Sequence, residues 1–150
     1  MTNFSEEIIF KTNGVLTLGA EIEFQLIDKD SLNLTPRAND LLDAGKFIKN
    51  LKQEFYLSTV EICTDKRDDV HQIKDDLKLS FEALTPIGND LGIRFSTTGC
   101  HPFARYSDCV ITPSKRYIAY IHLLAHCFND NCSWFNQVQP CPRFLLRENK

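Results

Sequence analysis

The sequence lacks the features that mark several classes of protein. Lys and Arg number 17 against 20 Asp and Glu, and the net charge of −3 leaves no electrostatic footprint for nucleic acid or an anionic membrane. No apolar run approaches the ~20 residues that a membrane-spanning helix needs. The opening residues, MTNFSEEIIFKTNG, place acids where a secretory signal has a basic start, so we expect a cytoplasmic protein.

Internal repeats, low-complexity linkers and a disulfide scaffold are also missing. The cysteines show no compact scaffold spacing and are expected to be thiols in a reducing compartment: Cys63, Cys100, Cys109, Cys127, Cys132 and Cys141. A chain of this length buries roughly 68–70% of its unfolded surface, which is enough for one core. With 43% hydrophobic and 25% charged residues, the composition predicts one globular unit.

The most regular pattern present is LTLGAEIEFQL, from Leu16 to Leu26. Alternate residues are apolar, which predicts one half-buried strand over the whole stretch. Thr17, Glu21, Glu23 and Gln25 share its polar face. After it, Thr35 as N-cap and Pro36 at the first helical position predict a helix. Its core-facing residues would be Leu41, Leu42, Ala44, Ile48 and Leu51.

Two more strands and a second helix are predicted further along. FYLSTVEIC, from Phe55 to Cys63, is rich in β-branched and aromatic residues and is typical of a strand. A helix follows, with Pro86 expected to break or kink it and Gly92 able to close it. IRFSTT, from Ile93 to Thr98, is the third strand. The helix is indicated by apolar residues at spacings of three and four, namely Val70, Ile73, Leu77, Phe81 and Leu84.

Glu21 and Glu23 raise the question of a metal site. Residues two apart on a strand lie about 6.5–7 Å apart, so both carboxylates can reach one or two cations. Their repulsion at ~7 Å is about 0.6 kcal/mol in water and about 2.4 kcal/mol at an effective dielectric constant of ~20. A solvated pair is therefore tolerable, and half-exposed sheets normally show such an exposed polar strand face without any metal. Glu61, inside STVEICT, is a third acid that is unfavourable among apolar residues unless it is paired, metal-bound or exposed.

Five segments together resemble the bacterial carboxylate–amine ligases, the second glutamate–cysteine ligase family. They occur in the family's order over about Leu16 to Tyr117, and are TLGAEIEFQLID, TPRANDLL, STVEICT, GCHPFARYSD and TPSKRY. The resemblance implies an α+β fold, with a mainly antiparallel sheet, helices packed on one face, and an incomplete catalytic domain of the glutamine-synthetase-like type. It also implies ATP and Mg²⁺ as cofactors. The implied reaction activates the side-chain carboxylate of glutamate as an acyl phosphate, which an amine, typically that of cysteine, then attacks.

The resemblance also implies roles for individual residues. Glu21, Glu23 and Glu61 would hold the magnesium ions and the phosphates, and Glu54 would be a further metal ligand. Because Glu54 stands seven residues before Glu61, an odd offset, it would need a bulge or an irregular strand start to share that face.

His101 and Arg105 of HPFAR fall in the active-site region implied by the resemblance, as candidate catalytic residues. Arg105 matches the fork geometry of phosphates and carboxylates, as does Arg116 beside Lys115. A structural histidine and ordinary surface cations are the alternatives.

The chain departs from the family pattern after Tyr117. The motif G-x-H-V-H-V-G expected there is absent, and family members are considerably longer. We therefore divide the chain into a ligase-like part, 1–118, and a divergent tail, 119–150, that we expect to be truncated or frame-shifted and poorly packed. Little or no ligation is expected from the isolated chain unless a second chain supplies the missing half. A homo-oligomer or a complementing chain is the expected macromolecular partner. A non-catalytic remnant or binding module is the alternative.

The tail offers one rival site. His122 and His126 would share a helix face, and Cys127, Cys132 and Cys141 supply soft donors suited to zinc. Their spacing matches no zinc finger, ribbon or knuckle. An amphipathic helix with incidental thiols explains the same residues.

Overall fold

The computed structural model describes residue 14 and residues 16–121. The chain divides into two compact units, Met1–Val110 and Ile111–Lys150. The elements of the first unit are β1 (Glu21–Asp28), α1 (Ala38–Ala44), β2 (Leu51–Gln53), β3 (Thr59–Cys63), α2 (Val70–Asp90), β4 (Ile93–Ser96) and the 3₁₀ turn η1 (Tyr106–Asp108).

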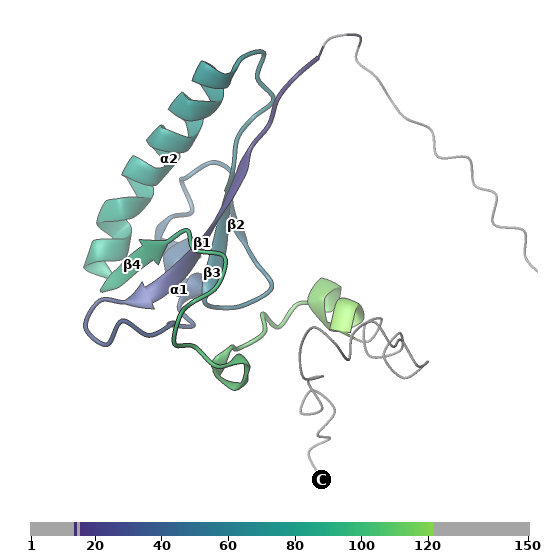
Figure 1. The fold of residues 1–150 in the computed structure, drawn as a ribbon. Helices are drawn as coiled ribbons and strands as arrows, with labels where there is room; N and C mark the ends of the chain where they lie inside the picture. The colour runs from purple at the N-terminus through teal and green to yellow at the C-terminus, as the bar shows by residue number, and fades with distance from the viewer. Residues whose placement is uncertain (1–13, 15, 122–150) are drawn as a thin grey trace, which may run out of the picture. The chain divides into compact units, whose positions relative to one another are not determined.

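The four strands form one antiparallel sheet in the order β2-β3-β1-β4 (Figure 1). This confirms the α+β class and the antiparallel sheet. From β1, Phe24 and Leu26 enter a core that both helices share, and Ile22 packs against it. The core residues are Phe24, Leu26, Ala38, Leu41, Ile48, Val60, Ile62, Leu84 and Ile93. The helices therefore cover the apolar side of β1 and β3, and the odd-numbered residues of β1 lie on the other side.

Strand β1 begins later than its sequence pattern predicts. Leu16 is 97% exposed and Leu18 is 50% exposed, and β1 starts only at Glu21. Leu18 forms an isolated bridge with Arg67, beyond the end of β3. The apolar alternation before Glu21 therefore has no core to face, and the prediction of one strand over the whole stretch was wrong at its beginning.

Helix α1 also begins later than predicted. Arg37, not Thr35, is its N-cap residue, and Gly45 ends the helix. The N–H of Thr35 donates instead to the carbonyl of Leu26, so the backbone there still runs beside β1. The helix therefore begins two residues after the predicted N-cap.

The segment predicted as a strand from Phe55 is half turn and half strand. Strand β3 covers only Thr59–Cys63. The sequence pattern gave no sign of β2 at Leu51–Gln53, which pairs with β3 as a hairpin. A three-residue strand is too short to show a period of two, so only its pairing reveals it.

Helix α2 is the longest element and confirms the predicted periodicity. Its N-cap is Asp69, whose side chain accepts hydrogen bonds from the N–H groups of His71 and Gln72. Pro86 lies inside the helix, which continues to Asp90, so the expected break does not occur. The carbonyl four residues before this proline belongs to exposed Glu82, where water can replace the missing hydrogen bond.

In the second unit, residues 115–121 are helical. The hydroxyl of Ser114 accepts a hydrogen bond from the N–H of Tyr117, which is the geometry of an N-cap. The tail that we expect to be poorly packed lies outside the described residues from His122 onward, and so do the residues of the zinc hypothesis, from His122 to Cys141. Over the described part of the chain, no helix combines the length and the apolarity needed to cross a membrane.

Gly88 gives a test of the packing between α2 and β4. A Cβ at this position would lie 2.5 Å from the ring of Phe95 and 3.2 Å from the carbonyl of Ile93. Gly→Ala ordinarily stabilises a helix by about 1 kcal/mol, whereas overpacking costs about 1–3 kcal/mol. We expect Gly88→Ala to lower the free energy of unfolding in a urea titration. Asn89→Ala, at an exposed position of the same helix, is the control, and a more stable Gly88→Ala protein would contradict this packing.

Candidate metal centre

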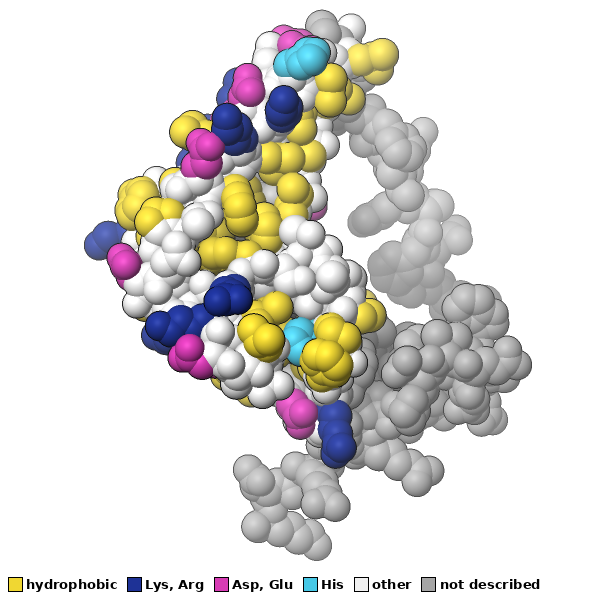
Figure 2. Space-filling view, turned by 60° about the vertical axis from the view of Figure 1, so that its left-hand side comes forward, with side chains coloured by type: hydrophobic (Ala, Val, Ile, Leu, Met, Phe, Trp, Pro, Cys, Tyr) yellow, Lys and Arg dark blue, Asp and Glu magenta, His cyan; other side chains and the backbone are white. Residues whose placement is uncertain are grey.

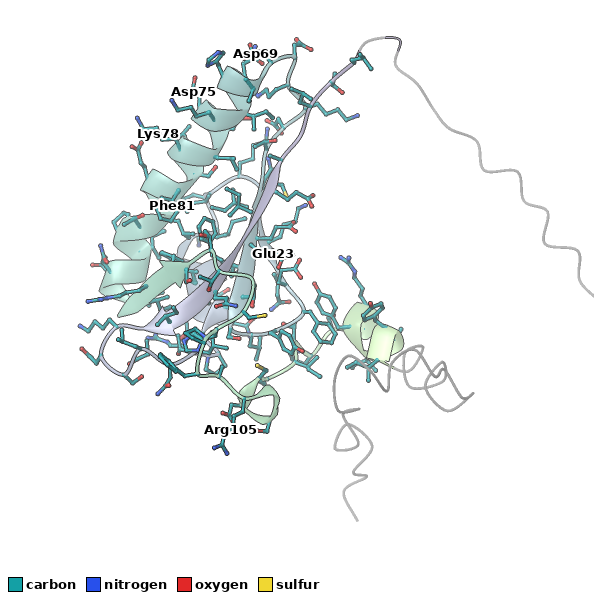
Figure 3. The ribbon with its side chains drawn as sticks, viewed as in Figure 1. Glu23, Asp69, Asp75, Lys78, Phe81 and Arg105 are labelled. Carbon is teal, nitrogen blue, oxygen red and sulfur yellow. The ribbon has the colours of Figure 1, made fainter. Side chains whose placement is uncertain are left out.

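The polar side of the sheet brings the acidic residues of β1 and β3 together. The antiparallel register places Glu23 opposite Glu61 and Glu21 opposite Cys63. Directly opposed residues of neighbouring strands point to the same face, about 4.5–5.5 Å apart. Glu23 lies on the side of β1 that faces away from α2 (Figure 3). The sheet thus separates the acidic side chains from the apolar core.

Glu54 also belongs to this group, although its odd offset from Glu61 would place the two on opposite faces of one regular strand. Ligand oxygens of Glu23, Glu54 and Glu61 all lie within 4.8 Å of one another. Glu54 directly follows β2, and β2 and β3 are two antiparallel strands. The chain reverses between Glu54 and Glu61, so counting residues along one strand does not apply. The expected bulge is therefore not needed.

A second group overlaps the first at Glu61. One donor atom each from Glu21, Glu61 and Cys63 also lie within 4.8 Å of one another. Glu61 therefore connects all of the predicted acidic ligands. Whether they bind metal or nucleotide stays a prediction at this point, since exposed acidic groups often converge without an ion.

The surroundings of Glu23 raise the proton affinity of its carboxylate. The pKa of Glu23 is raised from 4.5, first by loss of solvation and then by the charges of Glu54, Glu61 and Glu21. Lys52, opposite Glu61 on β2, places its Nζ 3.4 Å from Glu61 Oε1. One ammonium group beside four carboxylates leaves this face strongly negative. Such a face favours a bound cation.

Cys63 lies buried beside these charges. Its Sγ is 2.8 Å from Glu61 Oε1 and 2.8 Å from Lys52 Nζ. Burial, followed by the hydrogen bond to Glu61, raises the pKa of the thiol to about 11, although Lys52 acts in the opposite direction. At neutral pH the group is a thiol and a poor nucleophile. Cys63, Cys100 and Cys109 are free thiols, as expected, and the other three cysteines lie outside the described residues.

His101 is occupied by backbone contacts. Its Nδ1 accepts hydrogen bonds from the N–H groups of Phe103 and Ala104 at 3.3 and 3.1 Å. Its Nε2 lies 3.0 Å from the carbonyl of Leu32. This set requires the tautomer with a proton on Nε2, which then donates to the carbonyl. The ring therefore holds the loop after β4 to the loop after β1, and its catalytic role stays a prediction.

Arg105 is not brought to the carboxylates. Its side chain is exposed on the loop after β4 and lies well apart from Glu23 (Figure 3). Its backbone carbonyl accepts from the N–H of Asp108 at the 3₁₀ turn. Its role in binding an oxyanion likewise stays a prediction. Arg116 and Lys115 belong to the second unit, where the guanidinium of Arg116 lies 5.5 Å from the centre of the Tyr117 ring.

Sequence reasoning missed Lys52 as a member of the site and noticed Cys63 only as a neighbour of Glu61. Both become visible through pairing: Lys52 opposes Glu61, and Cys63 opposes Glu21. The useful signal was the hairpin itself. Lys52 and Glu54 of LKQEF lie beside Glu61 of TVEIC once the chain turns between the two segments.

Comparison with known proteins gives the family. The sequence profile of Glutamate-cysteine ligase family 2 (GCS2) matches residues 17–139. The chain belongs to this family. The family match confirms the resemblance seen in the five motifs and extends beyond Tyr117, where those motifs end.

Several curated relatives of glutamate–cysteine ligase family 2 support the assignment. The chain is 34% identical over 121 residues to a protein of Gloeobacter violaceus, covering 76% of this chain and 32% of the relative. It is 34% identical over 112 residues to one of Legionella pneumophila (strain Corby), covering 73% and 30%. It is 33% identical over 116 residues to one of Thermobifida fusca, covering 73% and 29%. These relatives bear the name "Putative glutamate--cysteine ligase 2", or 2-2 for the Legionella protein. The chain spans about a third of their length.

The raised pKa of Glu23 predicts how the free energy of unfolding depends on pH. With the pKa of Glu23 raised from 4.5, the folded chain binds more protons at this residue than the unfolded chain as pH rises from that value. The contribution of Glu23 to the free energy of unfolding therefore falls as pH rises through this window. Because the residue is exposed, we expect Glu23→Gln to be more stable than the wild type at pH 7 by only about 0.2–1 kcal/mol.

The difference in the free energy of unfolding between Glu23→Gln and the wild type should disappear below the ordinary carboxyl pKa. At such pH Glu23 is protonated in both the folded and the unfolded chain. Urea titrations between pH 3.5 and 7 measure this difference. Asp75→Asn removes a carboxylate from the exposed side of α2 and is the control for loss of one charge (Figure 3). A Glu23→Gln protein that is less stable than the wild type at pH 7 would show that repulsion does not dominate at this site.

Proposed function

We propose that the polar face of the sheet is the metal-binding side of an ATP-dependent carboxylate–amine ligase site that joins glutamate to cysteine or another amine. The observation that carries the proposal is the convergence of Glu23, Glu54 and Glu61, from three separate segments, within 4.8 Å. Membership of glutamate–cysteine ligase family 2 supports the reaction class.

The donor set fits magnesium. Mg²⁺ prefers oxygen ligands, usually one or two carboxylates completed by water and substrate phosphates. Glu23, Glu54 and Glu61 offer such oxygens, and Glu21 adds another carboxylate on the same face. The raised pKa of Glu23 supports the fit, because loss of solvation, followed by three neighbouring carboxylates, destabilises its charged form when no cation is near. Magnesium bound here would neutralise negative charge on a polyphosphate during phosphoryl transfer.

The residues of this chain would have distinct tasks at such a site. Glu23, Glu54 and Glu61 would hold the cation, and Lys52 would orient Glu61 through its contact at 3.4 Å. Cys63, with its pKa of about 11, would remain a neutral thiol and donate to Glu61 rather than attack the substrate. An acyl-phosphate route needs no nucleophile from the enzyme, which agrees with this assignment.

A non-catalytic binding module is the second candidate. Glu21 and Glu23 are exposed, so among the described residues of the first unit nothing shields these two carboxylates from water. Acyl-phosphate chemistry requires the reacting atoms to be aligned within about 3–3.5 Å and water to be excluded. This observation favours metal and nucleotide binding without turnover for the 150-residue chain alone.

Magnesium binding is the first test. Calorimetric titration of MgCl₂ with ATP into the purified chain should show binding that requires both components. Glu23→Gln should weaken it at least roughly tenfold, because even outer partners of metal ligands contribute 10–100-fold to affinity. Asp75→Asn should bind like the wild type. If the wild type and Glu23→Gln bind equally, the glutamates do not form the site.

Turnover is the second test. Release of ADP that depends on both glutamate and cysteine should be weak or absent for the isolated chain, because Glu21 and Glu23 are exposed to water. Rapid release that disappears in Glu23→Gln and persists in Asp75→Asn would establish the ligase activity for this chain itself. That result would contradict the binding-module alternative.

A further inference from the structure

Strand β1 is paired on both sides for only part of its length. On one side it pairs with β3 from Glu21 to Gln25. On the other side it pairs with β4 only from Gln25 to Asp28. Among the described residues, none pairs with the β4 side of β1 between Glu21 and Phe24. Within the part of the chain that the structure describes, the first half of β1 is thus an open edge.

The backbone groups at this edge can be assigned. The N–H of Leu26 donates to the carbonyl of Ser58, on the side of β3. Because successive residues of a strand direct their N–H groups to opposite sides, the N–H and C=O groups of Glu21 and Glu23 point to the open side. Unpaired groups of this kind form a template for another strand.

An apolar groove lies beside the open edge, on the helix-covered side of the sheet. It has a volume of about 300 Å³ and is lined by Ile22, Phe24, Ile62, Leu77, Lys78, Phe81 and Thr97. The Phe81 ring stacks on Phe24 with centroids 5.2 Å apart and remains 39% exposed. Hydrophobic side chains are visible as a band on this side of the molecule (Figure 2). A strand paired with the edge would direct alternate side chains into this groove.

The opposite side of such a strand would meet the carboxylates. Residues opposing Glu21 and Glu23 would share their face, beside Glu54 and Glu61. Opposite charges across strands contribute about 0.2–1 kcal/mol per pair, and like charges are unfavourable. The edge therefore favours basic residues at the positions that alternate with the apolar ones.

We propose that the open edge of β1 accepts an extended polypeptide segment in which apolar residues alternate with lysine or arginine. Its apolar residues fill the groove between β1 and α2, its basic residues face Glu21 and Glu23, and its backbone pairs with the edge. This is strand addition, in which main-chain hydrogen bonds give affinity and alternate side chains give specificity. The inference is independent of the ligase function, because it rests on pairing, the groove and charge.

A second copy of this chain is a less suitable occupant. Two identical edges that pair antiparallel about a two-fold axis place residues of one face opposite each other. Glu21 and Glu23 of one copy would then oppose the same residues of the other. Like charges in direct opposition destabilise paired strands.

The test uses two synthetic peptides that differ only in charge. Fluorescein-labelled Lys-Val-Lys-Val-Lys-Val should raise its fluorescence anisotropy on addition of the full chain. The matched peptide with Glu in place of Lys should bind at least tenfold more weakly. Hydrogen exchange followed by NMR should show new protection of the Glu21 and Glu23 amides with the Lys peptide, on the unmodified chain.

Matched variants locate the site on the protein. Phe81→Lys should weaken peptide binding at least tenfold, because it places a charge in the groove. Leu79→Lys is the control, since Leu79 is 71% exposed on the same helix and does not line the groove. Circular dichroism verifies the fold of both variants. The hydrogen-exchange measurement on the unmodified chain tests by itself whether the peptide pairs with the edge of β1.

Several outcomes would overturn the proposal. Equal affinity for the Lys and Glu peptides would exclude the charge complementarity. Protection of the Glu21 and Glu23 amides without peptide would show that another part of the chain already covers the edge. Self-association that Phe81→Lys removes, measured by analytical ultracentrifugation, would assign the edge to a second copy. Peptide binding without protection of these amides would place the contact elsewhere.

Discussion

The antiparallel pairing of β1 with β3 is the contact on which both sides of the sheet depend. It sets Glu23 opposite Glu61 on one face and Phe24 opposite Val60 on the other. A shift of one residue in this register would send the acidic side chains into the core and the aromatic ring into water. The burial of Phe24, Leu26 and Val60 therefore stabilises the register that places Glu23 opposite Glu61.

The same sheet explains why the acidic face is tolerated. Four carboxylates close together repel one another, and the pKa of Glu23 is raised first by loss of solvation and then by this repulsion. Much of the repulsion is screened because Glu21 and Glu23 are exposed, and Lys52 offsets part of the charge at Glu61. The core on the other side supplies the compensating stability, with fully buried Leu26, Leu41 and Leu84. A cation or a basic partner would relieve the charge that remains.

Strand β1 links the candidate metal centre to the proposed docking edge. Its side chains at Glu21 and Glu23 contribute to the acidic face, while the backbone of these residues points to the open side. A strand bound there would lie next to the carboxylates without displacing them. Binding at the edge and cation binding would then influence each other through charge, because both reduce the repulsion at Glu23.

The sequence by itself determined which residues of β1 alternate between the core and the polar face, the helical period of α2, and the membership of glutamate–cysteine ligase family 2. Periodicity and motifs are local properties of the chain, so they can be seen without the structure. It located the glutamates but misjudged Glu54, since strand parity assumes an uninterrupted strand. Only the tertiary structure decided that a hairpin after β2 brings Glu54 and Lys52 to Glu61, that the pattern before Glu21 has no core to cover, and that β4 leaves part of β1 unpaired. These features depend on which strands lie side by side and in what register, and pairing between distant segments leaves no periodic signal in either segment alone.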